Sequence, residues 1–253
     1  CYTVIISGKT DIFHKYSCRL FRKEFFRKDY FSMKAYQRLL SYVKISTPSN
    51  EESASSPSSQ CQFDLARLLV EELKDLGISD VSLDEHCYVY AHLPATKGLE
   101  HCKALGFIAH MDTVSDFCDH VVTPVVTEDY DGKELPLGTS GRTLSPEMFP
   151  HLASLAGRTL ITSDGTTILG ADDKAGIAEI LTALEHILTK KIPHGPLCVA
   201  FTPDEEIGMG PAHFDVKKFG ADYAYTLDGD TEGEIQYENF NACSAKVTFQ
   251  GVK

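Results

Sequence analysis

Four short, mainly apolar runs constrain the fold of this 253-residue chain most strongly. Continuous apolar runs of this length are typical of strands that are buried on both faces of a sheet. Between the second and the third run, apolar residues recur at helical spacing from Ile177 to Leu188. This order of strands and a long amphipathic helix predicts an α/β domain. The four runs lie at 105–109, 159–162, 197–201 and 223–227.

The remaining segments predict smaller elements around these runs. Apolar periodicity indicates a short helix after Lys34 and a second helix that ends at Gly77. The stretches 81–83 and 87–93 are predicted to be strands joined by a short turn, and 243–249 alternates as in an exposed strand. Between Ser115 and Arg158 periodicity fails and turn residues dominate, which predicts a long functional or poorly ordered loop.

Composition excludes several classes of protein. With 43% hydrophobic and 24% charged residues the chain is an ordinary globular protein, and its net charge of −12 makes a nucleic-acid partner unfavourable. No apolar run reaches the length of a membrane span, so we expect no membrane partner. The eight cysteines are scattered without any C-x-x-C pair, which favours a reduced cytoplasmic protein over a disulfide scaffold.

The first residues differ from the remainder of the chain. They begin with cysteine and cluster basic residues among aromatic ones, and the apolar core of a signal peptide is missing. A basic targeting arm is one interpretation of this segment. We favour another, in which residues 1–33 are a non-native or disordered leader and Met33 marks the true start.

A histidine or a carboxylate follows each of the four apolar runs. These residues are His110, Asp172, the pair Glu205 and Glu206, and Asp228. The carboxyl ends of strands in open α/β sheets border the crevice where ligands bind, so we expect these side chains to meet. So many buried like charges require cations or protonation. Taken singly, each residue has a structural alternative: a core histidine, a turn aspartate or a helix-capping glutamate.

In this order, the motifs resemble the M20 family of dizinc peptidases. The resemblance rests on His110-x-Asp112, Gly170-Ala171-Asp172-Asp173-Lys174, Asp204-Glu205-Glu206 and Asp228, and it covers roughly residues 34–253. It implies a three-layer, aminopeptidase-like α/β catalytic domain with a mostly parallel, mixed sheet. By the same resemblance, residues 34–242 would form the N-terminal part of this catalytic domain. Residues 243–253 would form the first strand of a truncated lid and dimerisation domain.

The same resemblance implies roles for individual residues. His110 and Asp228 would hold one zinc ion, Glu206 would hold the other, and Asp172 would bridge the two; Co²⁺ and Mn²⁺ are alternatives to Zn²⁺. Asp112 would hydrogen-bond the imidazole of His110 and fix its tautomer. Glu205 would be the general base. A cis peptide bond is implied between Asp172 and Asp173, and we interpret Asp173 as structural.

The implied activity is removal of the N-terminal residue from tripeptides, with small peptides as substrates. A further histidine ligand and the lid are expected beyond Lys253, so we expect this chain to be a fragment with weak or no activity; a homodimer would form through that lid. Two alternatives stay open: an M20-type amidohydrolase acting on N-acyl amino acids, and a non-catalytic metal-binding protein.

Overall fold

The computed structural model describes residues 4–6, 33–229, 233–238 and 247–251, together with Cys243 and Ala245. The elements are β1 (Val4–Ile6), α1 (Ala35–Tyr42), α2 (Gln62–Asp75), β2 (Asp80–Leu83), β3 (Val89–Leu93), β4 (Leu105–His110), β5 (Pro124–Thr127), β6 (Leu135–Pro136), β7 (Thr143–Leu144), the 3₁₀ helix η1 (Pro150–Leu155), β8 (Thr159–Ser163), α3 (Lys174–Lys190), β9 (Leu197–Thr202), α4 (Val216–Phe219) and β10 (Tyr223–Thr226). Apart from Val4–Ile6 and Met33, the predicted leader lies outside the described residues. Of the strand predicted at 243–249, residues 243, 245 and 247–249 are described, and the structure assigns no strand to them.

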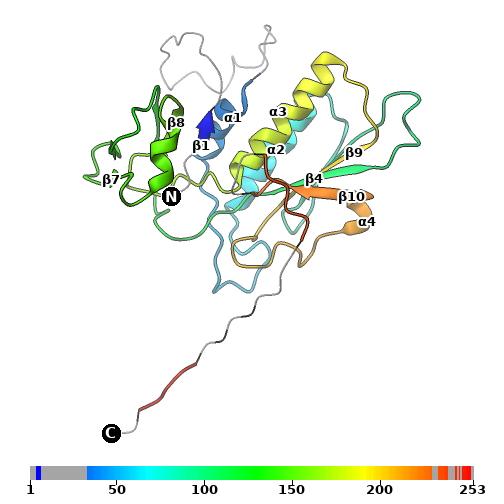
Figure 1. Ribbon diagram of the computed structural model, residues 1–253. Helices are drawn as coiled ribbons and strands as arrows, with labels where there is room; N and C mark the ends of the chain where they lie inside the picture. Colours follow the sequence, from blue (N-terminus) through cyan, green and yellow to red (C-terminus); the bar gives the residue numbers. More distant parts are fainter. Residues whose placement is uncertain are drawn as a thin grey trace.

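A five-stranded sheet in the order β10-β4-β9-β3-β2 forms the centre of the fold (Figure 1). β10, β4 and β9 are parallel, whereas β3 runs antiparallel to β9 and β2 runs antiparallel to β3. The sheet is therefore mixed, and the prediction of an α/β domain is confirmed.

Side chains alternate between two apolar layers, one on each face of this sheet. Val199 and Phe201 of β9 belong to the main core, which also contains the buried faces of α1, α2 and α3. Cys198 and Ala200, on the opposite face, pack with Tyr88, Tyr90 and Phe219. Because β9 is covered on both faces, it is buried throughout, as its continuous apolar sequence predicts.

A buried ion-pair network ties the three large helices together. Arg38 of α1 donates to Glu72 of α2 at 2.6 Å and to Glu185 of α3 at 2.7 Å. Tyr42 donates its hydroxyl proton to the other oxygen of Glu72. These bonds satisfy the charge of an arginine that is only 3% exposed, and they fix α3, which begins directly after Asp173.

The segment from Ser115 to Arg158 is more regular than its sequence predicts. It contains β5, β6, β7 and η1, and its buried residues form a small core together with Leu160 of β8. Its members are Tyr130, Leu135, Leu137, Leu144, Leu152, Leu155 and Leu160. Two of its strands have only two residues each, too few to show an alternating pattern, which is why the sequence suggested a loop.

No helix in the described part of the chain is long and apolar enough to cross a membrane.

Candidate metal centre

Three parallel strands carry candidate residues to one edge of the central sheet. His110 is the last residue of β4, Glu205 and Glu206 follow β9, and Asp228 follows β10. Because β4, β9 and β10 run in the same direction, their carboxyl ends meet at that edge. The structure thus brings together the side chains that the sequence places after three of the four apolar runs.

Asp172 reaches this edge by a different route from the one predicted. The apolar run before it forms β8, which belongs to a separate sheet in the order β1-β8-β5, so it is not a strand of the central sheet. The linker between β8 and α3 carries Asp172 to the site instead. Gly176 permits this approach, because a Cβ there would collide with the carbonyl oxygen of Leu227, just before Asp228.

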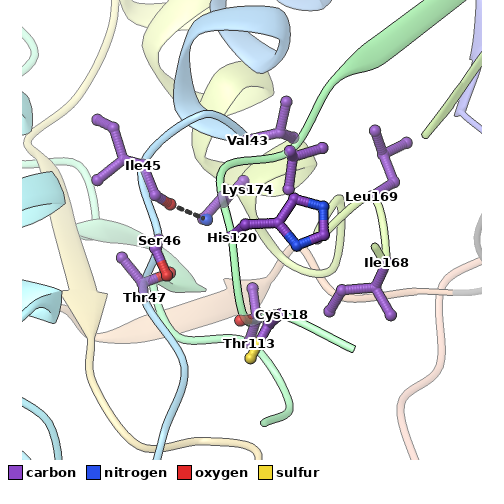
Figure 2. Close-up of a pocket in the computed structure, with 12 residues that line it drawn as sticks. Val43, Ile45, Ser46, Thr47, Thr113, Cys118, His120, Ile168, Leu169 and Lys174 are labelled. Atoms are coloured by element: carbon purple, nitrogen blue, oxygen red, sulfur yellow. Dashed lines mark hydrogen bonds between the residues drawn. The ribbon is translucent and has the colours of Figure 1, made fainter. Parts of the chain in front are cut away.

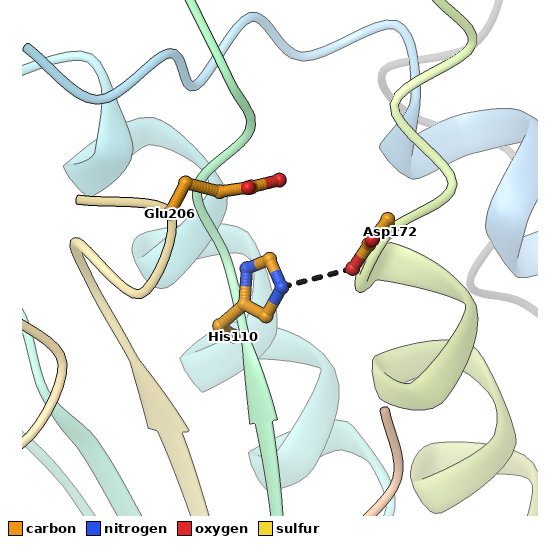
Figure 3. Close-up of side chains that lie close together, drawn as sticks. All are labelled: His110, Asp172 and Glu206. Atoms are coloured by element: carbon orange, nitrogen blue, oxygen red, sulfur yellow. Dashed lines mark hydrogen bonds and ion pairs between the residues drawn. The ribbon is translucent and has the colours of Figure 1, made fainter. Parts of the chain in front are cut away.

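The Nε2 atom of His110 is directed at Asp172, with Glu206 nearby (Figure 3). It is 3.0 Å from Oδ1 of Asp172, 3.7 Å from Oε2 of Glu205 and 3.9 Å from Oδ2 of Asp228. Two sets of three residues have ligand atoms within 4.8 Å of one another: His110 with Asp172 and Glu206, and His110 with Glu205 and Asp228. The four predicted carboxylate ligands and base therefore lie close to the imidazole of His110.

Asp112 is fully buried and binds the backbone next to this cluster. Its Oδ1 accepts the N–H of Glu205 at 2.9 Å, and its Oδ2 accepts the N–H of Glu206 at 3.1 Å. Nδ1 of His110 lies 3.0 Å from the carbonyl oxygen of Asp112 and 3.3 Å from its Oδ1. With acceptors on that side, Nδ1 keeps its proton, so Nε2, which lies 3.0 Å from Asp172, is the nitrogen that would become a ligand after losing its own proton.

Asp173 holds the backbone around the cluster. Its carboxylate accepts the N–H of His110 at 3.2 Å and that of Gly176 at 3.1 Å, so it caps α3. The peptide bond between Asp172 and Asp173 is cis, as predicted. These contacts agree with a structural role for Asp173.

Asp204 has a positioning role that the sequence analysis missed. Its backbone adopts a left-handed φ of 57°, and its buried carboxylate accepts bonds from the N–H of Ser58 and the side-chain amide of Gln62, both at 2.7 Å. The turn that carries Glu205 and Glu206 is thereby anchored to the start of α2. The only signal in the sequence is a third acidic residue beside the pair, and it does not distinguish an anchor from a ligand.

The charges of the cluster perturb one another strongly. Burial lowers the pKa of His110, but the carboxylates of Asp112 and Asp172 outweigh it and bring this pKa up to about 11. Burial raises the pKa of Glu206 to about 7 and that of Asp228 to about 6, and the carboxylate of Asp172 acts in the same direction on both. The hydrogen bond from His110 lowers the pKa of Asp172. One imidazole thus faces several carboxylates, an arrangement that additional positive charge would stabilise.

The chemistry of these donors fits a divalent cation. An imidazole nitrogen and carboxylate oxygens are ligands that Zn²⁺, Co²⁺ and Mn²⁺ share. Nδ1 of His110 donates to the buried carbonyl oxygen of Asp112. Metal-binding histidines usually have such an acceptor on the nitrogen that does not bind the metal.

Comparison with known sequences gives consistent matches. The profile of peptidase family M20/M25/M40 matches residues 164–243. A peptidase T of Bacillus licheniformis is 54% identical over 220 residues, which are 86% of this chain and 53% of that protein. A peptidase T of Clostridium perfringens is 52% identical, with 86% and 53% covered. The chain thus spans about half the length of the curated relatives it matches.

Solved structures show the same likeness. The aminopeptidase PepT of Bacillus cereus superposes with a TM-score of 0.56 at 26% identity, covering 78% of this chain and 43% of that one. A tripeptidase of Staphylococcus aureus gives a TM-score of 0.55 at 26% identity, with the same coverage. These similarities agree with the α/β catalytic fold that the sequence predicts.

Proposed function

Because the chain belongs to peptidase family M20/M25/M40, we propose that it supplies the metal-binding and proton-transferring residues of a tripeptide aminopeptidase. The observation that carries the proposal is the convergence of His110 Nε2 with carboxylates from three separate segments, supported by Asp112. The identity with two curated peptidases T supports the reaction and the substrate class. Homodimerisation through a lid domain stays a prediction.

The proposed site holds two divalent cations, preferably Zn²⁺. His110 and Asp228 would hold one, Glu206 the other, and Asp172 would lie between them. When bound, such cations polarise the scissile carbonyl group and acidify water. Acceptors hold Nδ1 of His110, so Nε2 is the ring nitrogen that would bind metal once its proton is lost. The short turn after β9 fixes Glu205 and Glu206 side by side.

Glu205 is the proposed proton carrier. Its side chain is half exposed, so it can reach both the site and a peptide, and its backbone is fixed by Asp112. The carboxylate would take a proton from the attacking water and later deliver it to the leaving amine. The same side chain also belongs to one of the two possible ligand sets, so the role of base must be separated from that of ligand by experiment.

The proposal is tested by metal analysis and peptide hydrolysis. We would measure both on the chain alone and on the chain joined to the C-terminal half of the Bacillus licheniformis peptidase T. We expect the joined form to bind two metal ions and to release alanine from the N-terminus of trialanine. Failure to bind divalent metal, or hydrolysis of N-acetyl amino acids in place of tripeptides, would refute the proposal.

Metal affinity is expected to depend steeply on pH. With a pKa of about 11, His110 must lose a proton when metal binds at neutral pH, so affinity for Zn²⁺ should fall by about tenfold per pH unit below pH 8. The slope should steepen below pH 7 and again below pH 6, where Glu206 and then Asp228 also hold protons. Chelator competition between pH 8 and pH 5.5 measures this slope. An affinity that does not change with pH would contradict the assignment of these ligands.

A further inference from the structure

The connection between α1 and α2, residues 43–61, lies against three of the segments that form the candidate metal centre. Near its start, the carbonyl oxygen of Ile45 accepts a hydrogen bond from the side chain of Lys174 at 2.7 Å (Figure 2). Lys174 is only 2% exposed and lies two residues beyond Asp172. The cavity between them, which residues 168–170 also line, has a volume of 20 Å³, enough for about one water molecule. The connection is thus packed closely against the segment that carries Asp172.

A few residues further on, the connection is bonded to the backbone on both sides of Asp112. The Thr47 hydroxyl donates to the carbonyl oxygen of Met111 at 2.7 Å. The N–H of Thr113 donates to the carbonyl oxygen of Thr47, and the N–H of Ser49 donates to that of Thr113, both at 3.0 Å. These bonds fix the second segment of the centre to the same connection.

The end of the connection holds Asp204, which directly precedes Glu205. The buried carboxylate of Asp204 accepts three hydrogen bonds, from the N–H and the hydroxyl group of Ser58 and from the side-chain amide of Gln62. The amide oxygen of Gln62 also accepts the N–H of Asp204 at 3.3 Å. Ser58 is 6% exposed and Gln62 is fully buried, so water cannot readily replace these bonds when one is lost.

Ser58 also links the two ends of the connection to each other. Its hydroxyl oxygen accepts the N–H of Asn50 at 2.9 Å while its proton is donated to Asp204. Asn50 follows Ser49, which is bonded to Thr113. A displacement of the turn after β9 is therefore opposed by a chain of bonds that leads back to Thr113.

The turn after β9 has to place two side chains at once, because Glu206 is a proposed ligand and Glu205 the proposed proton carrier. We propose that Ser58 and Gln62 are positioning residues, which act through Asp204 to hold both glutamates in place. This inference rests on the proposed function and assigns the support of its proton carrier to the α1–α2 connection. Loss of a partner that orients a metal ligand typically lowers affinity or activity by about 10–100-fold.

Amide hydrogen exchange in the metal-free chain tests this support without turnover. NMR can follow the N–H groups of Glu205 and Glu206, whose hydrogen bonds must open before exchange occurs. We expect Ser58→Ala and Gln62→Met each to speed the exchange of both groups by about tenfold. Gln60→Met makes the same change at an exposed position of the connection and should have no effect.

A second variant separates local positioning from a general loss of stability. Leu152→Ala loosens the small core that also contains Leu137, whose N–H is hydrogen-bonded at 2.9 Å. It should speed exchange at Leu137 and leave Glu205 unchanged, whereas Ser58→Ala should do the reverse. Wild-type exchange at Glu205 in both Ser58→Ala and Gln62→Met, or equal acceleration at Leu137, overturns the inference.

Kinetics of the joined form provide a second readout at saturating Zn²⁺. Ser58→Ala should lower kcat by about tenfold and leave KM unchanged, because the proton carrier acts in the transition state. Ser58→Thr keeps the hydroxyl group and should restore kcat. An unchanged kcat in Ser58→Ala would also overturn the inference. Because exchange is measured without metal, failure of the chain to bind Zn²⁺ would count against the proposed function only.

Discussion

Replacing Glu205 with alanine is expected to lower kcat for tripeptide hydrolysis by about 10²–10⁴-fold, the range typical of a lost general base. Metal content should stay at the wild-type value. The physical reason is that the neighbouring ligands are held by contacts that do not involve the Glu205 carboxylate. The Asp112 carboxylate binds the backbone N–H groups of residues 205 and 206, and these survive the substitution. Steady-state kinetics and metal analysis of the joined enzyme measure the two quantities.

Glu206→Ala is the matched comparison, because it removes the adjacent carboxylate from the same turn. It should lose one metal ion together with activity. An exposed glutamate such as Glu128 should tolerate the same change with neither effect. If Glu205→Ala also lost metal, Glu205 would be a ligand, as its place in the set with His110 and Asp228 allows. If activity were retained, the proton carrier would be another group.

Residues at strand ends could be placed from sequence because a parallel sheet has a simple geometry. Apolar runs identify β4, β9 and β10, and parallel direction is enough to bring His110, Glu206 and Asp228 to one edge. The same reasoning failed for β8, which has an equally apolar sequence but pairs in another sheet. Apolar content indicates a strand, but it reveals neither which sheet the strand joins nor how deeply it is buried, since β10 at the edge of the sheet is exposed along its length.

Contacts between segments that are distant in the chain could not be predicted from the sequence. The bond from Gln62 to Asp204 depends on how the segment before α2 packs against the turn after β9. Periodicity carries no information about such pairs. Resemblance to a family placed Asp112 beside His110, but it did not show that the same carboxylate also accepts the N–H groups of Glu205 and Glu206.

Asp112→Asn tests that shared support, and we expect it to weaken metal binding by about 10–100-fold and to lower kcat as well. The asparagine side chain has one acceptor oxygen where aspartate has two, so its NH₂ group would face the N–H of Glu205 or Glu206. A buried N–H left without an acceptor costs about 1–3 kcal/mol, so the unfolding free energy should fall by a similar amount. Denaturant unfolding and chelator competition measure the two losses.

The histidine tautomer should survive this substitution, which makes the origin of the loss identifiable. Nδ1 of His110 keeps the carbonyl oxygen of residue 112 as an acceptor at 3.0 Å. The effect should therefore come from the displaced turn that carries Glu205 and Glu206, so metal is bound more weakly but not lost outright, as it is for one ion in Glu206→Ala. Asp116→Asn, at an exposed position of the following loop, is the control and should change neither quantity. Wild-type metal affinity in Asp112→Asn would mean that the bonds from Asp112 to residues 205 and 206 do not hold the ligands in place.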